Sequence, residues 1–334
     1  MKKTKTVICL ILVMILILSV SACGKTAESD VASNEPRTIK LSVCVNEKDG
    51  FYVAAAKFEE LVEERTGGNI NIEIYPNSTL GDERTTIEGM QNGTVDMGVI
   101  TCGPVANFVP EISVFEMPFL FSSAEEAYKV LDGPVGDKVI AMLDKVNLKG
   151  LAYAERGFRN LTNSKKPVLN VDDIKGLKIR VMENPLYIDA FKALGANAVP
   201  MAWTETLTAL QQGTIDGQEN PINVVYAFKL YETQKYLSLT QHTYAPALFL
   251  MSKQTFESLD EETRGIFEVA SKEAATYERN WNAEQMVEQM EFIKEQGTEI
   301  VEPDLASFQD AMQPVYEKYG EKFGSLLEEI EAAK

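Results

Sequence analysis

Hydrophobic and polar positions recur with two different periods along this 334-residue chain, and the mixture predicts an α/β protein. Strand-like runs are expected at 39–45, 69–75, 95–100, 177–182, 198–200 and 247–252, and a further strand begins at 215–216. Helical spacing is found at 53–64, 85–91, 187–194, 206–211 and 261–295, and again over 305–333 with a break near Pro314. Up to residue 246, strands and helices alternate in two halves, which indicates two α/β lobes.

Two junctions in these halves share letters: GMQNGTVDMG at 89–98 and ALQQGTIDGQ at 209–218. Both read hydrophobic-Gln-x-Gly-Thr-hydrophobic-Asp, with Gly93 and Gly213 expected at the ends of their helices. Chance convergence on a helix, a glycine cap and a strand is the alternative, but seven features in one order favour duplication. Ligands of such sheets bind beyond the carboxyl ends of the strands, so two facing lobes predict a cleft.

The N-terminus has the parts of a secretory signal over 1–22: lysines, an apolar run over 7–20, and small residues before Cys23. The letters VSAC at 20–23 are similar to a bacterial lipobox, which predicts lipidation at Cys23 and a polar tether over 23–36. A transmembrane anchor is the alternative, but the run is shorter than the ~20 residues that span hydrocarbon. We expect an extracytoplasmic protein, lipid-anchored to the outer face of the cytoplasmic membrane.

A formal net charge of −18 argues against nucleic acid as a partner and against a basic membrane-binding face. Any site for an anion must therefore be local and strongly cationic. Beyond the tether, Cys44 and Cys102 could pair in an oxidising compartment, but their apolar surroundings favour two buried free thiols.

Motifs for catalysis, metal binding and nucleotide binding are missing from the sequence. The one histidine, His242, stands in polar company, and we interpret it as a hinge or surface residue. The chain is therefore not expected to be an enzyme or to need a metal or cofactor.

Arg180 lies inside an apolar strand-like run. Because an unpaired buried charge is costly, Arg180 needs an anionic partner, either a ligand or a structural carboxylate.

Seven segments, taken together and in order, resemble the solute-binding proteins of TRAP transporters over about residues 38–320. They are YPNSTLGDER (75–84), NGTVDMGV (92–99), FEMPFLF (115–121), GFRNLTNSKKPV (157–168), GLKIRVM (176–182), GANAVPMAW (195–203) and QQGTIDGQENP (211–221). The resemblance implies a two-lobe periplasmic-binding-protein-like fold with a cleft between the lobes and a long C-terminal spine helix. It places lobe I at 37–156 and 246–286, and lobe II at 157–245 and 287–334. It also implies a monomer that delivers a small organic acid to membrane permease subunits.

The same resemblance implies four ligand contacts. Arg180 matches the arginine that clamps the ligand carboxylate, and its fork suits a carboxylate better than lysine does. Arg159 matches a second arginine, Asn220 an asparagine of the QEN segment, and Trp203 an aromatic against the ligand. The alternatives are loop-stabilising roles for Arg159 and Asn220 and a place in the core for Trp203.

Departures from the family pattern narrow the ligand. Thr101 and Pro104 stand where sialic acid binders carry a glutamate and an arginine, which argues against sialic acid. Glu183 replaces an asparagine and would repel a second carboxylate. Glu83 and Asn46 align with ligand-side loops, and Phe158, with Phe51 and Trp203, could form an apolar wall. We expect a sugar acid or hydroxy monocarboxylate, with a C4-dicarboxylate as the alternative. A sensory receptor for a membrane kinase would use the same fold.

Overall fold

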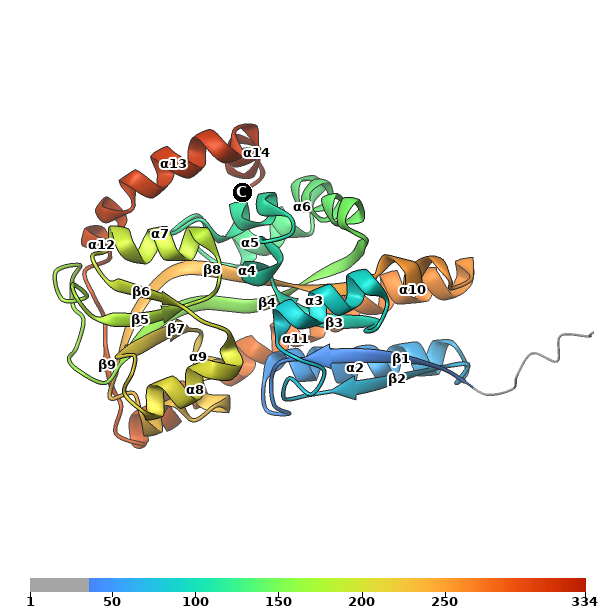
Figure 1. Ribbon diagram of the computed structural model, residues 1–334, viewed down its shortest axis with the longest axis horizontal. Helices are drawn as coiled ribbons and strands as arrows, with labels where there is room; N and C mark the ends of the chain where they lie inside the picture. The colour runs from blue at the N-terminus through green and yellow to red at the C-terminus, as the bar shows by residue number, and fades with distance from the viewer. Residues whose placement is uncertain (1–35) are drawn as a thin grey trace, which may run out of the picture. The chain divides into compact units, whose positions relative to one another are not determined.

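The strands of the protein form one mixed sheet in the computed structural model, which describes residues 36–334. The sheet order is β2-β1-β3-β8-β4-β7-β5-β6, and β9 also pairs with β8. The bounds are β1 Arg37–Val43, β2 Ile70–Tyr75, β3 Met97–Thr101, β4 Leu148–Asn163, β5 Lys178–Val181, β6 Asn197–Pro200, β7 Gly217–Asn220, β8 Tyr236–Ser252 and β9 Glu299–Val301. Two parallel triplets, β2-β1-β3 and β6-β5-β7, flank the long antiparallel pair β8 and β4, which runs from one triplet to the other (Figure 1).

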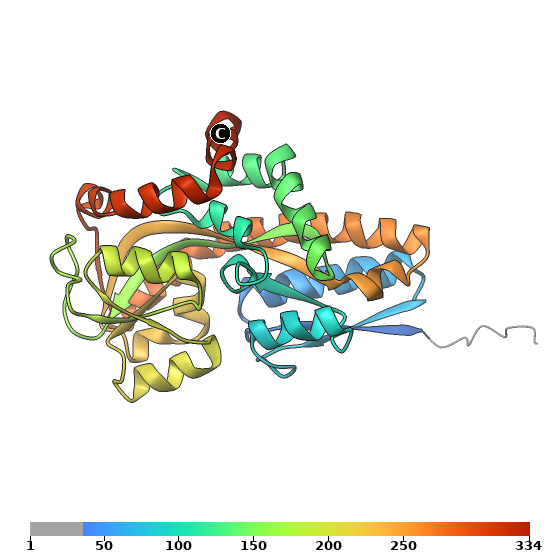
Figure 2. The ribbon, with the colours of Figure 1, turned by 45° about the horizontal axis from the view of Figure 1, so that its top comes forward.

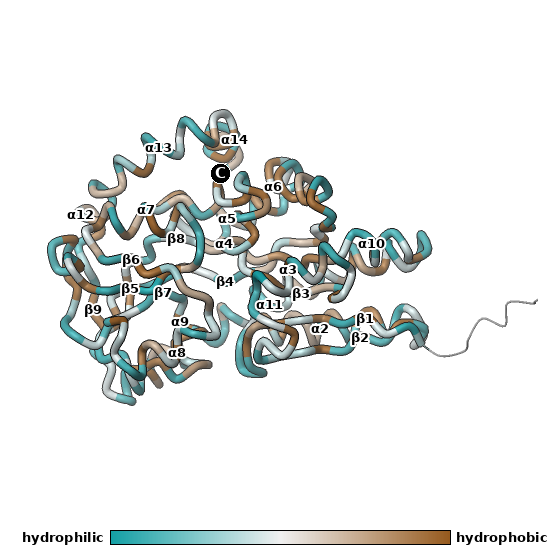
Figure 3. The backbone as a smooth tube through the Cα atoms, viewed as in Figure 1, coloured by the Kyte–Doolittle hydropathy of each residue, from teal (hydrophilic) through white to brown (hydrophobic). Residues whose placement is uncertain are grey.

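Helices cover both triplets. Their bounds are α2 Gly50–Arg65, α3 Glu83–Asn92, α4 Cys102–Val105, α5 Ala124–Leu131, α6 Pro134–Ile140, α7 Pro185–Ala193, α8 Trp203–Gln211, α9 Ile222–Ala227, α10 Lys253–Glu257, α11 Glu261–Glu295, α12 Leu305–Ala311, α13 Gln313–Phe323 and α14 Ser325–Ala333. Three 3-10 turns complete them, η1 Pro110–Glu116, η2 Ala141–Val146 and η3 Leu230–Glu232. Hydrophobic and hydrophilic residues alternate along helices such as α6 and α14, as expected where one side of a helix covers a core (Figure 3).

The two junctions with shared letters make the same hydrogen bonds. Oδ2 of Asp96, just before β3, accepts from the backbone N–H of Lys40 in β1 at 2.9 Å. Oδ2 of Asp216, just before β7, accepts from the backbone N–H of Lys178 in β5 at 2.9 Å. Asp96 thus links the start of β3 to β1, and Asp216 links the start of β7 to β5 in the same way. The matching strand orders and these bonds favour duplication over convergence.

The long helix is confirmed with the predicted bounds, Glu261–Glu295. At about 1.5 Å per residue its 35 residues extend over roughly 50 Å. Phe267 near its start is buried in one core with residues of β1 and α2, and Ile293 near its end is buried in another with residues of α8 and α9. Figure 2 shows the ribbon in a second view. One helix therefore belongs to the cores of both halves. None of the described helices is long and apolar enough to cross a membrane.

Some expectations were incomplete. β4 was not predicted, and only the last part of β8 was. The break expected near Pro314 falls at Met312, since Pro314 lies in the first turn of α13, where its missing N–H costs nothing; a second break lies at Gly324. Residues Arg37–Lys334 form one compact unit by their contacts, and the lobe boundaries remain a prediction. The signal peptide, Cys23 and almost all of the tether fall outside the described residues.

Candidate ligand-binding cavity

The carboxyl ends of the parallel strands converge on one cavity, where α/β sheets bind ligands. Val45 follows β1, Thr101 ends β3, Met182 follows β5 and Asn220 ends β7, and all four line the cavity. The open space is about 30 Å³, room for roughly one or two water molecules. An organic acid therefore requires the cavity walls to move apart.

Arg180 reaches this cavity from β5 as a buried cation, only 4% exposed. Nε and Nη2 donate to the carbonyl oxygen of Met201 at 3.0 and 2.8 Å, and the guanidinium lies 5.5 Å from the ring of Trp203. No carboxylate of the described residues comes within 4.0 Å of it. Burial lowers the pKa of Arg180 to about 10; Arg159 adds to the shift, and Glu219 and Glu83 oppose it. The cation lacks an ion-pair partner, and an acid in the cavity would supply one.

Arg159 also lines the cavity, but a buried carboxylate already balances its charge. Nε and Nη2 donate to the two side-chain oxygens of Glu219, the latter bond being 2.9 Å long. Burial opposes ionisation of both groups, yet their mutual attraction holds the pKa of Glu219 below and that of Arg159 above its usual range. Arg159 lies on strand β4 and not on a loop, but its Nη2 also donates to the backbone carbonyl oxygen of Glu219 at 2.6 Å, so it has a structural role of the kind that the alternative expected.

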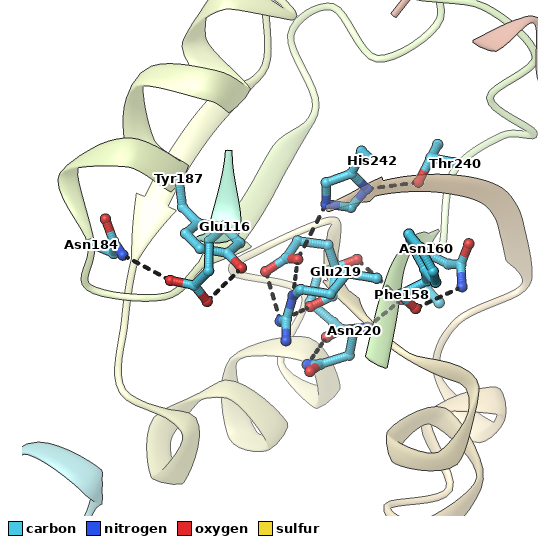
Figure 4. A network of polar contacts seen from close by, with 12 residues as sticks. Glu116, Phe158, Asn160, Asn184, Tyr187, Glu219, Asn220, Thr240 and His242 are labelled. Atoms are coloured by element: carbon cyan, nitrogen blue, oxygen red, sulfur yellow. Dashed lines mark hydrogen bonds and ion pairs between the residues drawn. The ribbon is translucent and has the colours of Figure 1, made fainter. Parts of the chain in front are cut away.

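Glu219 also contacts His242, which corrects the interpretation of that histidine. His242 is buried on β8; its Nε2 lies 3.3 Å from Oε2 of Glu219 and its Nδ1 2.8 Å from the hydroxyl of Thr240 (Figure 4). It is not a surface residue, and a hinge role on β8 remains a prediction. No pattern in the sequence indicates the contact with Glu219, because Glu219 and Arg159 are both distant from His242 along the chain.

Arg156 is a third cation of the cavity and was not predicted. Its Nη1 donates to both oxygens of Asp49 at 2.9 and 2.8 Å, and its guanidinium carbon lies 3.5 Å from the ring centre of Phe51. Asp49 is also the N-cap of α2. The argument used for Arg180 would have identified Arg156, because it too stands in a largely apolar run.

Glu83 is an acidic group of the cavity lining, and Thr101 is its hydrogen-bond partner. Oε1 of Glu83, at the start of α3, accepts from the backbone N–H of Thr101 at 2.7 Å. Burial raises the pKa of Glu83, while this hydrogen bond and the charges of Arg156 and Arg180 favour its ionised form.

Asn220 and Trp203 both line the cavity as expected. Asn220 ends the buried strand β7 and does not lie in a loop, as its loop-stabilising alternative assumed, and its Nδ2 donates to Oε1 of Gln218 at 2.5 Å. Trp203 begins α8 and packs edge-to-face on Phe228, with ring centres 4.9 Å apart. Trp203 therefore packs against Phe228 and also lies near the guanidinium of Arg180.

Three other predicted residues lie outside the lining of this cavity. Glu183 lines a small adjoining space with Arg180 and Trp203. Asn46 donates through Nδ2 to the carbonyl oxygen of Ala227 in α9 at 3.0 Å, and so links the first half of the chain to the second. Phe158 packs edge-to-face on Tyr244 and does not form an apolar wall here.

A second buried acid lies beside this network. The hydroxyl of Tyr187 donates to Oε1 of Glu116 at 3.0 Å, and the amide of Asn184 approaches Oε2 (Figure 4). Burial raises the pKa of Glu116 to about 8, and Tyr187 and Arg159 oppose the shift.

Three other features of residues 36–334 could bear on function: the two cysteines, the metal-ligating side chains and a second cavity. Cys44 and Cys102 are both buried and form no disulfide. No cluster of metal-ligating side chains occurs in this range. A larger cavity of about 480 Å³ lies between α6 and α11, and four of its charged groups form two ion pairs: Arg279 with Asp132 at 2.6 Å and Lys149 with Glu268 at 3.4 Å.

These features are those of a bacterial receptor that binds a solute between two α/β halves. The profile of bacterial extracellular solute-binding protein family 7 matches residues 41–322, and the chain belongs to this family. It has the two-lobe fold of the TRAP periplasmic solute-binding proteins. It is 39% identical over 287 residues to the 2,3-diketo-L-gulonate-binding periplasmic protein of Escherichia coli, covering 86% of this chain and 88% of that protein.

Two solved TRAP solute-binding proteins are closely similar. One, from Bordetella bronchiseptica and with density interpreted as pantoate, has a TM-score of 0.87 at 41% identity, covering 89% of this chain and 99% of that one. The other, from Polaromonas sp. JS666 and bound to D-erythronate, has a TM-score of 0.88 at 38% identity with the same coverage.

Proposed function

We propose that this protein is the extracytoplasmic receptor of a TRAP transporter for a small organic acid, a sugar acid or hydroxy monocarboxylate. Arg180 holds the ligand carboxylate, and membrane permease subunits receive the ligand. One observation carries the proposal: Arg180 is a buried guanidinium at the carboxyl ends of the strands, and no described carboxylate lies within ion-pair distance.

The relatives support the ligand class. The Escherichia coli relative is a 2,3-diketo-L-gulonate-binding protein, the Polaromonas protein is bound to D-erythronate, and the Bordetella structure has density interpreted as pantoate. Each of these acids is a monocarboxylate that carries oxygen substituents. The charge balance of the cavity agrees with a single carboxylate, because Glu219 already compensates Arg159 and Asp49 compensates Arg156. Of the three arginines that line the cavity, Arg180 alone has no described carboxylate within ion-pair distance, so we assign the ligand carboxylate to it.

The small volume of the cavity favours an opening and closing cycle. The side chain of Asn46 donates to the carbonyl oxygen of Ala227 in α9, and such a contact exists only when the two halves are together. Ligand binding stabilises the closed state through contacts from both halves. Small-angle scattering should therefore show a smaller radius of gyration with ligand than without it.

A thermal-shift screen of purified protein against a carboxylate library tests the proposal, since a ligand specific to the native state raises the melting temperature. Aldonates and other hydroxylated monoacids should give the largest shifts. A largest shift with succinate or malate would instead make the protein a C4-dicarboxylate receptor, and no shift with any acid would contradict the proposal.

A further inference from the structure

Two further charged groups line the cavity and are not part of the carboxylate clamp, Arg156 and Glu83. Nη1 of Arg156 is committed to Asp49, but its Nε and Nη2 donate to no described residue. Arg156 is 4% exposed and lines the cavity. A buried guanidinium with unused N–H groups at a cavity is a donor that a polar ligand group can satisfy.

The orientation of this donor is fixed by its surroundings. The guanidinium stacks on Phe51 at 3.5 Å, and the carboxylate of Asp49 holds one edge. Asp49 itself accepts from the backbone N–H of Phe51 at 3.0 Å as the cap of α2. Helix α2 therefore holds Arg156 through both its cap and its first aromatic residue, which leaves the free edge of the guanidinium little freedom.

Glu83 supplies an acceptor to the same cavity. The backbone N–H of Thr101 donates to one of its oxygens at 2.7 Å, and the Thr101 hydroxyl, Arg156 and Arg180 all favour the ionised carboxylate. A carboxylate has about four lone-pair sites, so Glu83 can accept from a ligand as well. A donor beside an acceptor matches a hydroxyl group, which both accepts and donates.

The charged groups of the cavity differ in their pairing. Arg159 and Arg156 have carboxylate partners, whereas among the described residues Arg180 has no carboxylate and Glu83 no cation within 4.0 Å. A ligand carboxylate is attracted to Arg180 and repelled by Glu83. Resting on the proposed function, we infer that Arg156 and Glu83 recognise hydroxyl groups of the acid, and so select polyhydroxylated monoacids against diacids.

Matched acids test this inference by titration calorimetry. D-erythronate and 2-hydroxybutyrate share four carbons and a 2-hydroxyl, but only the first has hydroxyls at carbons 3 and 4; galactonate and 2-hydroxyhexanoate form the six-carbon pair. Meso-tartrate and galactarate replace the terminal CH2OH of the aldonates by a second carboxylate. The pair whose aldonate binds more tightly to the unaltered protein is used throughout, and weak binders are measured by competition.

Arg156→Lys keeps a cation for Asp49 and removes the planar fork, so the fold should survive. We expect it to weaken aldonate binding about tenfold or more, the scale of lost hydrogen bonds to a charged donor, and to leave the deoxy acid within about twofold. Glu83→Gln can still accept from Thr101 N–H. This variant should bind the aldonate less tightly than the unaltered protein does. The ratio of its affinity for the aldonate to its affinity for the diacid should also fall, because the charge that repels the second carboxylate is gone.

The matched control is Arg180→Lys, which should weaken the aldonate and the deoxy acid alike. The inference is overturned if Arg156→Lys weakens binding of the aldonate and of the deoxy acid equally and Glu83→Gln leaves the ratio of aldonate to diacid affinity unchanged. The proposed function would still stand in that case. Failure of the unaltered protein to bind either aldonate contradicts the proposed function, and this inference with it.

Discussion

Arg159 donates to both side-chain oxygens of Glu219 in the interior of the protein, and this ion pair decides which arginine is available to a ligand. Glu219 is fully buried and also contacts His242. Because Glu219 neutralises Arg159, Arg180 is the buried arginine of the cavity without an ion-pair partner among the described residues. The pair thus balances the charge of one of the arginines that line the cavity, and on the proposed function it leaves Arg180 for the ligand carboxylate.

Removing one member of this pair should strongly destabilise the fold. Glu219→Gln leaves a buried, unpaired Arg159, and we expect the free energy of unfolding to fall by about 3–5 kcal/mol. Denaturant unfolding followed by circular dichroism measures the loss. Asp172→Asn, which breaks the exposed pair with Lys175, is the control and should barely move the midpoint. A Glu219→Gln variant as stable as this control would show that the buried pair is not structural.

Glu116 should make stability depend on pH. Its pKa is about 8 in the folded protein against 4.5 for an ordinary glutamate, so the folded state keeps a proton that the unfolded chain releases. Its contribution is complete below about pH 4.5 and is lost as the pH rises to about 8. Glu116→Gln cannot ionise. Its free energy of unfolding relative to the unaltered protein should therefore rise between pH 5 and 9, as chemical denaturation would reveal; a difference that stays flat across this range contradicts the assignment.

Much of the two parallel triplets could be predicted, because their strands are short, apolar or alternating, and bounded by glycine caps such as Gly93. The sequence pattern did not predict strand β4, and the reason is physical. Its pairing with β8 shifts register at three places, including Glu155/Gly157, so a period of two does not persist along it. Gly157 has a φ of 102°, where a strand-forming residue would be strained. Bulges of this kind leave no simple pattern in the sequence.

The candidate site was only partly predictable for a similar reason. Arg180 and Asn220 stand at strand ends within segments that resemble a known family, so their place at the cavity could be expected. Arg156 and His242 depend on Asp49 and Glu219, partners from distant parts of the chain. The charge balance of the cavity follows from those pairings and becomes visible only when the chain is folded.

Glu183 is expected to influence selectivity from the adjoining space that it shares with Arg180. A second carboxylate near it would meet a like charge in a partly dry site. Glu183→Asn should therefore strengthen binding of succinate or malate relative to hydroxylated monoacids, as measured by calorimetry and by ligand-induced shrinkage in scattering. An unchanged ranking of these acids, or tighter binding of succinate than of every monoacid by the unaltered protein, would sink the idea.

The lipid anchor at Cys23 lies outside the described residues and remains a prediction from the sequence. Cys23→Ser should release the protein from membranes, because the modified thiol is lost, while ligand binding is unchanged. Fractionation of expressing cells after a high-salt wash measures this. A variant that stays with the membrane fraction would favour the transmembrane alternative.

The most direct test of the account is calorimetric binding of the tightest-binding aldonate to the Arg180→Lys variant. Lysine keeps the charge but loses the planar fork, which should cost on the order of 1.5–3 kcal/mol of binding free energy, or roughly a tenfold to hundredfold higher Kd. Thermal unfolding without ligand shows whether the variant is folded. Affinity equal to that of the unaltered protein in a folded variant would contradict the claim that Arg180 holds the ligand carboxylate.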